Sequence, residues 1–131
     1  MMQRLICVLF IFYCGQAFGQ QVDINALQPD SVYENVCSKK IYSDSLSTTF
    51  VIWIKHTVPK HYHAAHTEQV FVLEGHATML LGDVWLDVAP GQQIFIPKGT
   101  PHSVKVKEGE VLKVISIQSP MFDGTDRIKL E

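Results

Sequence analysis

Histidine and carboxylate side chains suited to binding a metal gather in one short stretch of this chain. His61, His63 and Glu68 fall within eight consecutive residues. His61 and His63 are two residues apart, so in an extended chain both side chains leave the same face. Glu68 can approach them if the chain folds back in between. Two imidazole nitrogens and a carboxylate oxygen suit a divalent cation, and only a ligand from elsewhere in the chain is then missing.

His102 is the candidate for the missing ligand. It follows an apolar run at residues 93–96 and a turn at residues 97–101 that contains Pro97, Gly99 and Pro101. Proline fixes φ and glycine accepts unusual backbone angles, so this turn sets the angle at which His102 enters the next strand. Together with the earlier stretch, His102 predicts a site of three nitrogens and one oxygen.

His66 lies inside the same cluster, in the turn predicted between the metal ligands. One interpretation places it at the mouth of the site, where its imidazole acts as the catalytic acid or base. The other interpretation makes it a solvated turn residue. His56 and His76 stand apart from the cluster and are predicted to lie on the surface.

Short apolar runs separated by turn residues indicate the fold that positions these side chains. Residues 48–54 and 69–73 are rich in β-branched and aromatic residues, and Gly82-Asp83 suits a tight hairpin between 77–81 and 84–88. Apolar residues do not recur at helical spacing beyond the N-terminus. The chain is therefore predicted to be all-β, with one barrel over residues 45–118. The large aromatic residues are expected to fill its core: Trp53, Phe71, Trp85 and Phe95.

The N-terminus differs in composition from the remainder. Arg4 precedes a continuous apolar run at residues 5–13, and small residues follow near Gly19, a pattern typical of a secretory signal peptide. A membrane anchor is the alternative, but Gly15 and Gln16 interrupt a run already too short to span. We expect residues 1–19 to be a signal peptide, 20–44 an N-terminal arm, and 119–131 a C-terminal tail packed on the barrel. The protein is then exported, to the periplasm or outside the cell, and is free of the membrane after cleavage.

Charge limits the kinds of partner expected for the protein, and cysteine content limits how its fold can be stabilised. Removal of residues 1–19 leaves 10 of the 11 lysines and arginines against 13 acidic residues, with no basic stripe, so nucleic acid is not expected as a partner. Cys37 is the one cysteine that remains. An internal disulfide is therefore excluded, and the fold must be stabilised by its core.

The two stretches together resemble the motifs of the cupin superfamily, whose members are small jelly-roll β-barrels. The first motif is matched by His61-x-His63, four residues, Glu68, six residues and Gly75. The second is matched by Gly91, Pro97-x-Gly99 and His102. The resemblance covers residues 45–118 and is that of a small single-domain cupin with a type-2 conserved barrel.

Two positions depart from the family pattern. Lys55 stands where the first motif begins with glycine, and Val106 stands where the second motif ends with asparagine. Lys55 is expected to change only a turn or a strand start. Val106 shares the parity of His102, so it is predicted to face the interior and to give a drier wall with one polar group fewer.

The resemblance implies that His61, His63, Glu68 and His102 bind one divalent transition metal, which could be iron, manganese, zinc, nickel or copper. It implies a small-molecule substrate or ligand and is compatible with a homodimer. Two functions remain open. One is a metal-dependent enzyme of the dioxygenase, isomerase or lyase type, and the other is a non-catalytic module that binds or senses a sugar or an organic acid.

Overall fold

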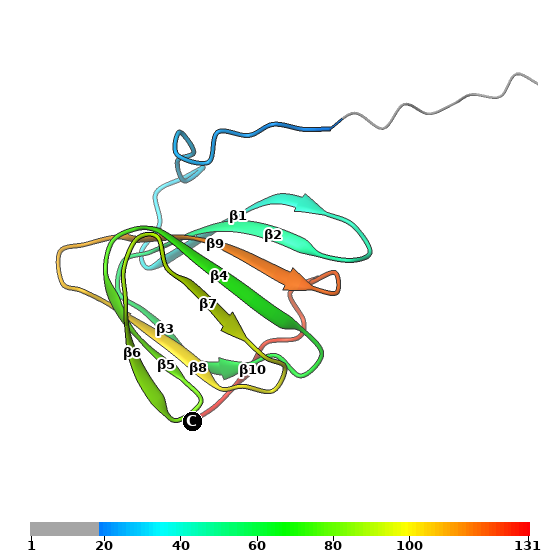
Figure 1. The fold of residues 1–131 in the computed structure, drawn as a ribbon. Coiled ribbons are helices and arrows are strands. Elements are labelled where there is room, and N and C mark those ends of the chain that lie inside the picture. The colour runs from blue at the N-terminus through cyan, green and yellow to red at the C-terminus, as the bar shows by residue number, and fades with distance from the viewer. Residues whose placement is uncertain (1–18) are drawn as a thin grey trace, which may run out of the picture.

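The computed structural model describes residues 19–131, and the predicted signal peptide lies almost entirely outside them. The described residues contain strands and turns but no helix, as the sequence predicts (Figure 1). The strands are β1 (Val36–Ser43), β2 (Thr48–Ile54), β3 (Thr57–Tyr62), β4 (Thr67–Glu74), β5 (Ala77–Leu81), β6 (Val84–Val88), β7 (Gln93–Ile96), β8 (His102–Val106), β9 (Leu112–Ser119) and β10 (Ile128–Lys129).

Two antiparallel sheets of five strands each face one another (Figure 1). One sheet has the order β1-β2-β9-β4-β7, and the other has the order β10-β3-β8-β5-β6. The β5–β6 hairpin closes with Leu81 opposite Val84, which confirms the two-residue turn predicted at Gly82-Asp83. The fold is all-β and resembles a jelly roll, so the two inner faces enclose one interior.

Strand alternation divides that interior into two ends. On β9 the inward residues are Val114, Ser116 and Gln118, so the strand becomes polar toward its C-terminal end. Gln118 is opposite Glu68 on the neighbouring strand, whereas Val114 is opposite Val72. Polar side chains therefore collect at one end of the barrel and apolar side chains at the other.

The apolar end forms a continuous hydrophobic core. Its members come from both sheets and pack against one another: Ile54, Val72, Ala77, Met79, Val88, Ile94, Ile96, Val106, Leu112 and Val114. Burial of such side chains is the main favourable term in folding, at about 25 cal/mol for each Å² of apolar surface removed from water. The core thus stabilises residues 19–131, in which the cysteine Cys37 forms no disulfide.

Both flanking segments contribute strands to the sheets. β1 lies within residues 20–44, predicted as an arm, and it pairs with β2 along the sheet edge. β10 lies within the predicted tail and pairs with β3. The buried Lys113 binds the carbonyl oxygens of Asn25 and Leu27, so the residues before β1 cover the outer face of the first sheet.

Two of the aromatic residues predicted to fill the core lie outside it. Trp53 is buried, but Trp85 is 60% exposed and Phe95 is 54% exposed. β6 and β7 are edge strands of their sheets, and the alternation that points Ile94 and Ile96 inward turns Phe95 outward. The sequence identified β6 and β7 as strands correctly, but aromatic content alone did not reveal which of their faces was covered.

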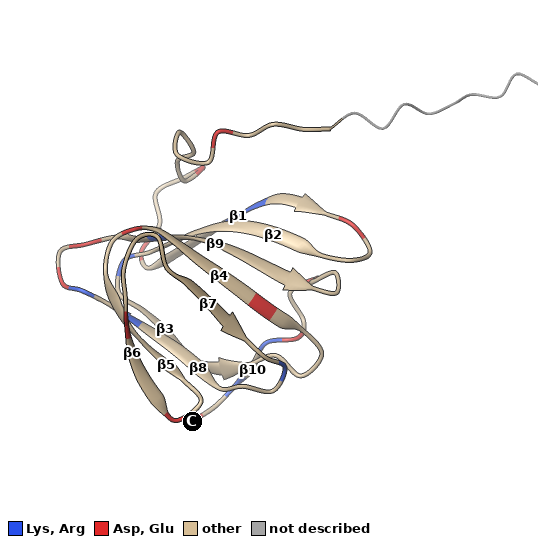
Figure 2. Ribbon diagram, in the orientation of Figure 1, with Lys and Arg blue, Asp and Glu red and all other residues tan. Residues whose placement is uncertain are grey.

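Charged residues lie mainly in the turns and at the ends of strands (Figure 2). The lysines and arginines are scattered and do not form a stripe along the described chain (Figure 2). Residues 19–131 contain no helix that is long and apolar enough to cross a membrane.

Candidate metal centre

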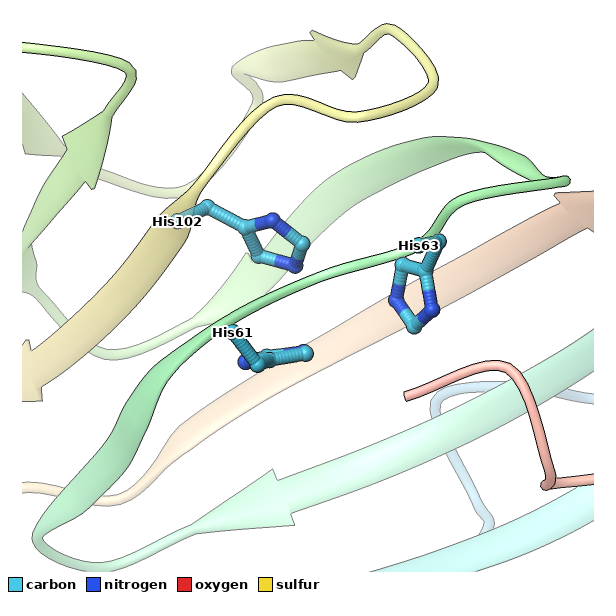
Figure 3. Close-up of side chains that lie close together, drawn as sticks. All are labelled: His61, His63 and His102. Atoms are coloured by element: carbon cyan, nitrogen blue, oxygen red, sulfur yellow. The ribbon is translucent and has the colours of Figure 1, made fainter. Parts of the chain in front are cut away.

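Three histidines converge at the polar end of the barrel. His61 is on β3, His63 follows that strand directly, and His102 opens β8 opposite His61 (Figure 3). The ring centroids of His61 and His102 are 4.2 Å apart, and those of His63 and His102 are 5.4 Å apart. Each ring offers a nitrogen, and these three atoms lie within 4.8 Å of one another. The prediction that distant His102 joins His61 and His63 is confirmed.

Backbone carbonyl groups orient all three rings. The Nδ1 atom of His61 bonds to the Pro59 carbonyl at 2.8 Å, and that of His102 bonds to the Thr100 carbonyl at 3.0 Å. The Nδ1 atom of His63 bonds to the carbonyl of Asp126 in the tail. A carbonyl oxygen only accepts, so each Nδ1 carries a proton, and in the neutral ring the Nε2 atom keeps its lone pair. This second layer of hydrogen bonds is the usual arrangement around metal-binding histidines.

Glu68 approaches this cluster from the opposite sheet. Its Oε2 atom is 3.4 Å from the Nε2 atom of His63 and 3.5 Å from the Nε2 atom of His102. The hydroxyl of Ser116 donates a hydrogen bond of 2.5 Å to its other oxygen, Oε1. Glu68 lies beside two of the three nitrogens but is not a member of the tight histidine group.

The electrostatics of the cluster keep a carboxylate charged and an imidazole neutral. Burial alone would raise the pKa of Glu68, but the adjacent rings of His102 and His63 and the hydrogen bond from Ser116 hold it well below its ordinary value. Burial, with the ring of His102 and the guanidinium of Arg127 nearby, lowers the pKa of His61 to about 4. Burial works against the charge on His63, but its bonds to Glu68 and Asp126 raise its pKa overall.

These residues fit a bound metal ion. The Nε2 atom of His102 is buried and has no hydrogen-bond partner among residues 19–131, which is costly for a polar atom unless something else binds it. Neutral imidazole nitrogens and an ionised carboxylate are the forms that bind metals. The donor set is the one that zinc, iron, manganese, nickel and copper share.

The glycines of both stretches hold the site in place. Gly99 adopts a φ of +72° in the turn before His102, and its N–H donates to the carbonyl of His63 at 2.7 Å. A Cβ atom on Gly75 would come within 2.3 Å of the Val111 carbonyl oxygen. Glycine is therefore required where β4 ends against the start of β9 and where the turn joins His63.

A family model described as "Cupin domain" matches residues 49–118 of the chain. The chain belongs to the cupin family. An uncharacterized protein of Aquifex aeolicus is 33% identical over 82 residues, which are 63% of this cupin and 67% of the relative.

Solved structures share the fold at low sequence identity. KdgF from Halomonas sp. has a TM-score of 0.70 and 19% identity, with coverage of 81% of this cupin and 97% of that chain. The polyketide cyclase RemF from Streptomyces resistomycificus has the same TM-score and identity, with coverage of 87% of each chain. At this identity the likeness shows the fold alone.

The two departures from the cupin motifs have clear structural consequences. Val106 is buried in the apolar core, as its parity predicted, and does not line the cavity described below. Lys55 occupies the connection between β2 and β3, where its Nζ atom donates to the carbonyl of Tyr33 at 2.6 Å. Neither residue approaches the histidine cluster.

A cavity of about 180 Å³ extends from the histidines into the barrel. For comparison, an apolar cavity of roughly 150 Å³ holds a benzene molecule. Apart from the four proposed ligands, the polar residues that line it are Ser38, Gln118 and Arg127. Most of the remaining wall is aliphatic, so the cavity has room for a small apolar group beside the histidine cluster.

His66 is buried but does not line that cavity in the described structure. Its Nδ1 atom bonds to the Asp126 carboxylate at 2.5 Å, and its Nε2 atom bonds to the Met121 carbonyl at 3.0 Å. The ring of Phe122 packs edge-on against both His66 and His63. The solvated interpretation of His66 is therefore wrong, and its catalytic role stays a prediction.

Sequence reasoning did not find several residues of the site. Ser116 and Gln118 were detectable, because they are polar residues at alternate positions of an otherwise apolar strand. Asp126 was not detectable, because its carbonyl group rather than its side chain orients His63. Arg127 reaches the cavity only because the tail pairs with β3.

Proposed function

We propose that this cupin binds one divalent transition metal through His61, His63, Glu68 and His102 and uses it on a small organic molecule. One observation carries the proposal. The three rings are fixed through Nδ1 so that their Nε2 lone pairs converge, and the Nε2 atom of His102 has no partner in the described chain. Such an arrangement has no purpose in packing, because it leaves a buried polar atom unsatisfied.

Each protein group has a defined part in this site. The carbonyl groups of Pro59, Thr100 and Asp126 fix the proton on Nδ1, and the hydroxyl of Ser116 holds Glu68. The aliphatic wall excludes water from the organic molecule. A bound divalent metal would supply Lewis acidity to an oxygen-bearing molecule beside these residues.

The enzyme that best fits is a metal-dependent oxidoreductase, isomerase or lyase acting on an oxygen-bearing substrate. Support comes from the size of the cavity and its position next to the open side of the histidine cluster. RemF, which shares the fold, is a polyketide cyclase, so the fold is compatible with catalysis on small organic molecules.

A non-catalytic binding module is the second candidate, and one observation favours it. Apart from the proposed ligands, the sole ionisable side chain that lines the cavity in residues 19–131 is Arg127. Arginine keeps its proton at all physiological pH values and is a poor general acid or base. A reaction at this site would therefore depend on the metal or bound water for proton transfer.

Metal analysis of the purified protein tests the proposal. We expect about one transition metal per chain after purification without chelator, and its loss in His61→Ala. His76→Ala is the matched control, because His76 is exposed and bonds only to Glu110 at the surface. Absence of metal from the wild-type protein, even after incubation with each of the five candidate ions, would refute the proposal.

Turnover separates the two candidates. Metal-loaded protein is mixed with phenols, diketones and hydroxy acids, and products are followed by mass spectrometry together with oxygen uptake. Product formation that the His61→Ala variant lacks supports the enzyme. Thermal stabilisation by such compounds without any product supports the binding module.

We further propose export, with cleavage near Gly19 and Gln20. Both residues are exposed and precede every strand, so cleavage there removes no part of the sheets. N-terminal sequencing of the protein from the exported fraction tests this, and a chain that retains residues 1–19 in the cytoplasm would contradict it.

A further inference from the structure

Gln118 is a buried side chain without a structural purpose in the described fold. It lies on the inner face of β9 between Thr48 and Glu68, its cross-strand neighbours, and is 6% exposed. Its Oε1 atom is buried and has no hydrogen-bond partner among residues 19–131. A buried amide left unpaired costs stability, so its presence calls for a partner that the chain itself does not supply.

The neighbours of Gln118 use their own polar groups elsewhere. Thr48 accepts a hydrogen bond of 2.9 Å from the N–H of Phe122 and shares another with Ser43. Glu68 is occupied by Ser116 and by the histidines. The amide of Gln118 therefore stays available, and it can present either its oxygen or its N–H groups by rotation about its last bond.

Arg127 brings a positive charge to the same end of the cavity. β10 pairs Ile128 with Tyr62 on β3, which sets Arg127 in register beside His63. Arg127 lines the cavity, and its guanidinium forms no ion pair with the described residues. A divalent metal, the Glu68 carboxylate and the Arg127 guanidinium, with neutral imidazoles, together give the site a net charge of about +2. Such a charge in an apolar cavity favours a negatively charged ligand.

The opposite wall is shaped for an apolar body. Away from the polar residues, aliphatic side chains from both sheets line the cavity, among them Ile52, Val70, Met79, Ile94, Val104 and Val114. None of them offers a hydrogen bond from its side chain. The ligand must consequently have polar atoms at one end and a hydrophobic chain or ring at the other.

We propose that the cavity takes a small organic acid with an apolar body, and that Gln118 determines specificity by hydrogen-bonding its oxygen-bearing end. Arg127 balances the carboxylate charge. This inference rests on the proposed function, since the same site holds the metal. Gln118 is not a proposed metal ligand, so its role can be tested while metal content is held constant.

Calorimetry on the metal-loaded full-length mature protein is the primary test. The probes are acetate, hexanoate and benzoate, each beside its uncharged amide. We expect hexanoate or benzoate to bind more tightly than acetate, because only they fill the apolar wall, and more tightly than their amides. Failure of all three carboxylates to bind to metal-loaded protein would overturn the assignment of the ligand class.

The variant Gln118→Met removes the amide at nearly constant volume. It is expected to weaken binding of the best carboxylate about tenfold or more, as the loss of a hydrogen bond to a charged group would, at an unchanged metal content. Gln93→Met, on the exposed face of β7, is the matched control and should bind as the wild type does. Wild-type affinity in Gln118→Met would refute the role of Gln118.

Two further measurements separate this role from a structural one. Gln118→Met without ligand should melt at a higher temperature than the wild type, because an unpaired buried oxygen is removed. A lower melting temperature would mean that the Gln118 amide is structural.

Arg127→Gln should weaken the binding of the carboxylate probes and reduce its dependence on salt, while leaving the binding of the uncharged amide probes unchanged. Loss of metal in the wild type would count against the proposed function, whereas full metal with unselective ligand binding would count against this inference alone.

Discussion

The two ends of the barrel interior are built from the same strands but bury different kinds of side chain. At one end, Glu68 and Gln118 face each other across β4 and β9, with His102 on the opposing sheet. At the other end, Val72 and Val114 occupy the equivalent places on the same two strands. One end contains buried polar atoms without partners in the described chain, and the other end contains none among its aliphatic side chains.

The difference separates stability from function within a single core. Apolar packing at one end stabilises the sheets and keeps the strands rigid. Those rigid strands then hold the imidazoles and the carboxylate in place at the other end, where burial of polar groups is unfavourable until a ligand binds. Substitutions at the polar end should therefore change metal binding more than stability, and substitutions at the apolar end should change stability more than metal binding.

The largest expected effect is on metal affinity in His102→Ala. Loss of a residue that merely orients a ligand already costs about 10–100-fold in metal affinity, so loss of a ligand should exceed 100-fold. Without metal, the variant should be at most about 1 kcal/mol less stable than the wild type, because an unpaired buried nitrogen is removed together with the ring. Metal titration and chemical denaturation measure the two quantities. A variant that binds metal normally would remove His102 from the site.

Leu112→Ala at the apolar end should give the opposite pattern. Leu112 is almost fully buried in the core, and truncation of such a leucine costs about 2–5 kcal/mol of unfolding free energy. The folded fraction should still bind one metal with nearly wild-type affinity, because Leu112 lies among the aliphatic residues rather than beside the histidines. Urea denaturation and metal titration at low temperature test both statements. A large loss of metal affinity would break the separation between the two ends.

A fall in pH should also affect the stability of the two ends differently, because the buried histidines lie at the polar end. The pKa of His61 is about 4 in the folded protein and about 6.5 in the unfolded chain, so between these values only the unfolded chain takes up the proton. The contribution of His61 should therefore favour the folded state most above about pH 6.5 and should be lost as the pH falls toward 4. His63 has a raised pKa and acts in the opposite direction: the stability that it contributes is present below about pH 6.5 and is lost as the pH rises through its folded value.

Melting temperatures of chelated protein between pH 7 and 4.5 measure this effect. His61→Ala should show a shallower decrease than the wild type across that range. Substitution of His56, which is exposed and forms no ion pair among the described residues, is the control and should leave the slope unchanged. Equal slopes for wild type and His61→Ala would mean that His61 is not held neutral by burial.

Much of the fold and of the histidine cluster could be predicted from the sequence, for physical reasons. Strand alternation and turn residues are local, so the hairpin at Gly82-Asp83 and the inward face of Val106 followed from neighbouring residues. The family spacing brought distant His102 to His61. Burial by other segments is not local, and the exposure of Trp85 depended on which strands ended at the edges.

The groups that orient the site residues were harder to predict, because one of them is a backbone carbonyl group of the tail. The carbonyl of Asp126 orients His63, and any residue type would provide that carbonyl. The Asp126 side chain fixes this position by accepting hydrogen bonds from the N–H groups of Ala64 and Ala65, both at 2.8 Å, and from His66. The hydrogen bond with His66, ahead of those with the two N–H groups, lowers the pKa of Asp126 below its ordinary value. The tail therefore contributes to the polar end, both through β10, which pairs with β3, and through Asp126.

Asp126→Asn should produce the smallest of the four effects and define how far the polar end extends. The amide can replace only part of the hydrogen bonding, so the carbonyl that orients His63 is held less firmly, and metal affinity should fall by about tenfold, the lower limit for such positioning groups. Asp123→Asn is the matched control, because the Asp123 carboxylate bonds only to Thr125 in the same turn. Metal titration with a competing chelator measures both variants. Equal metal affinities of Asp126→Asn and the wild type would show that the pairing of β10 with β3 positions His63 without the Asp126 side chain.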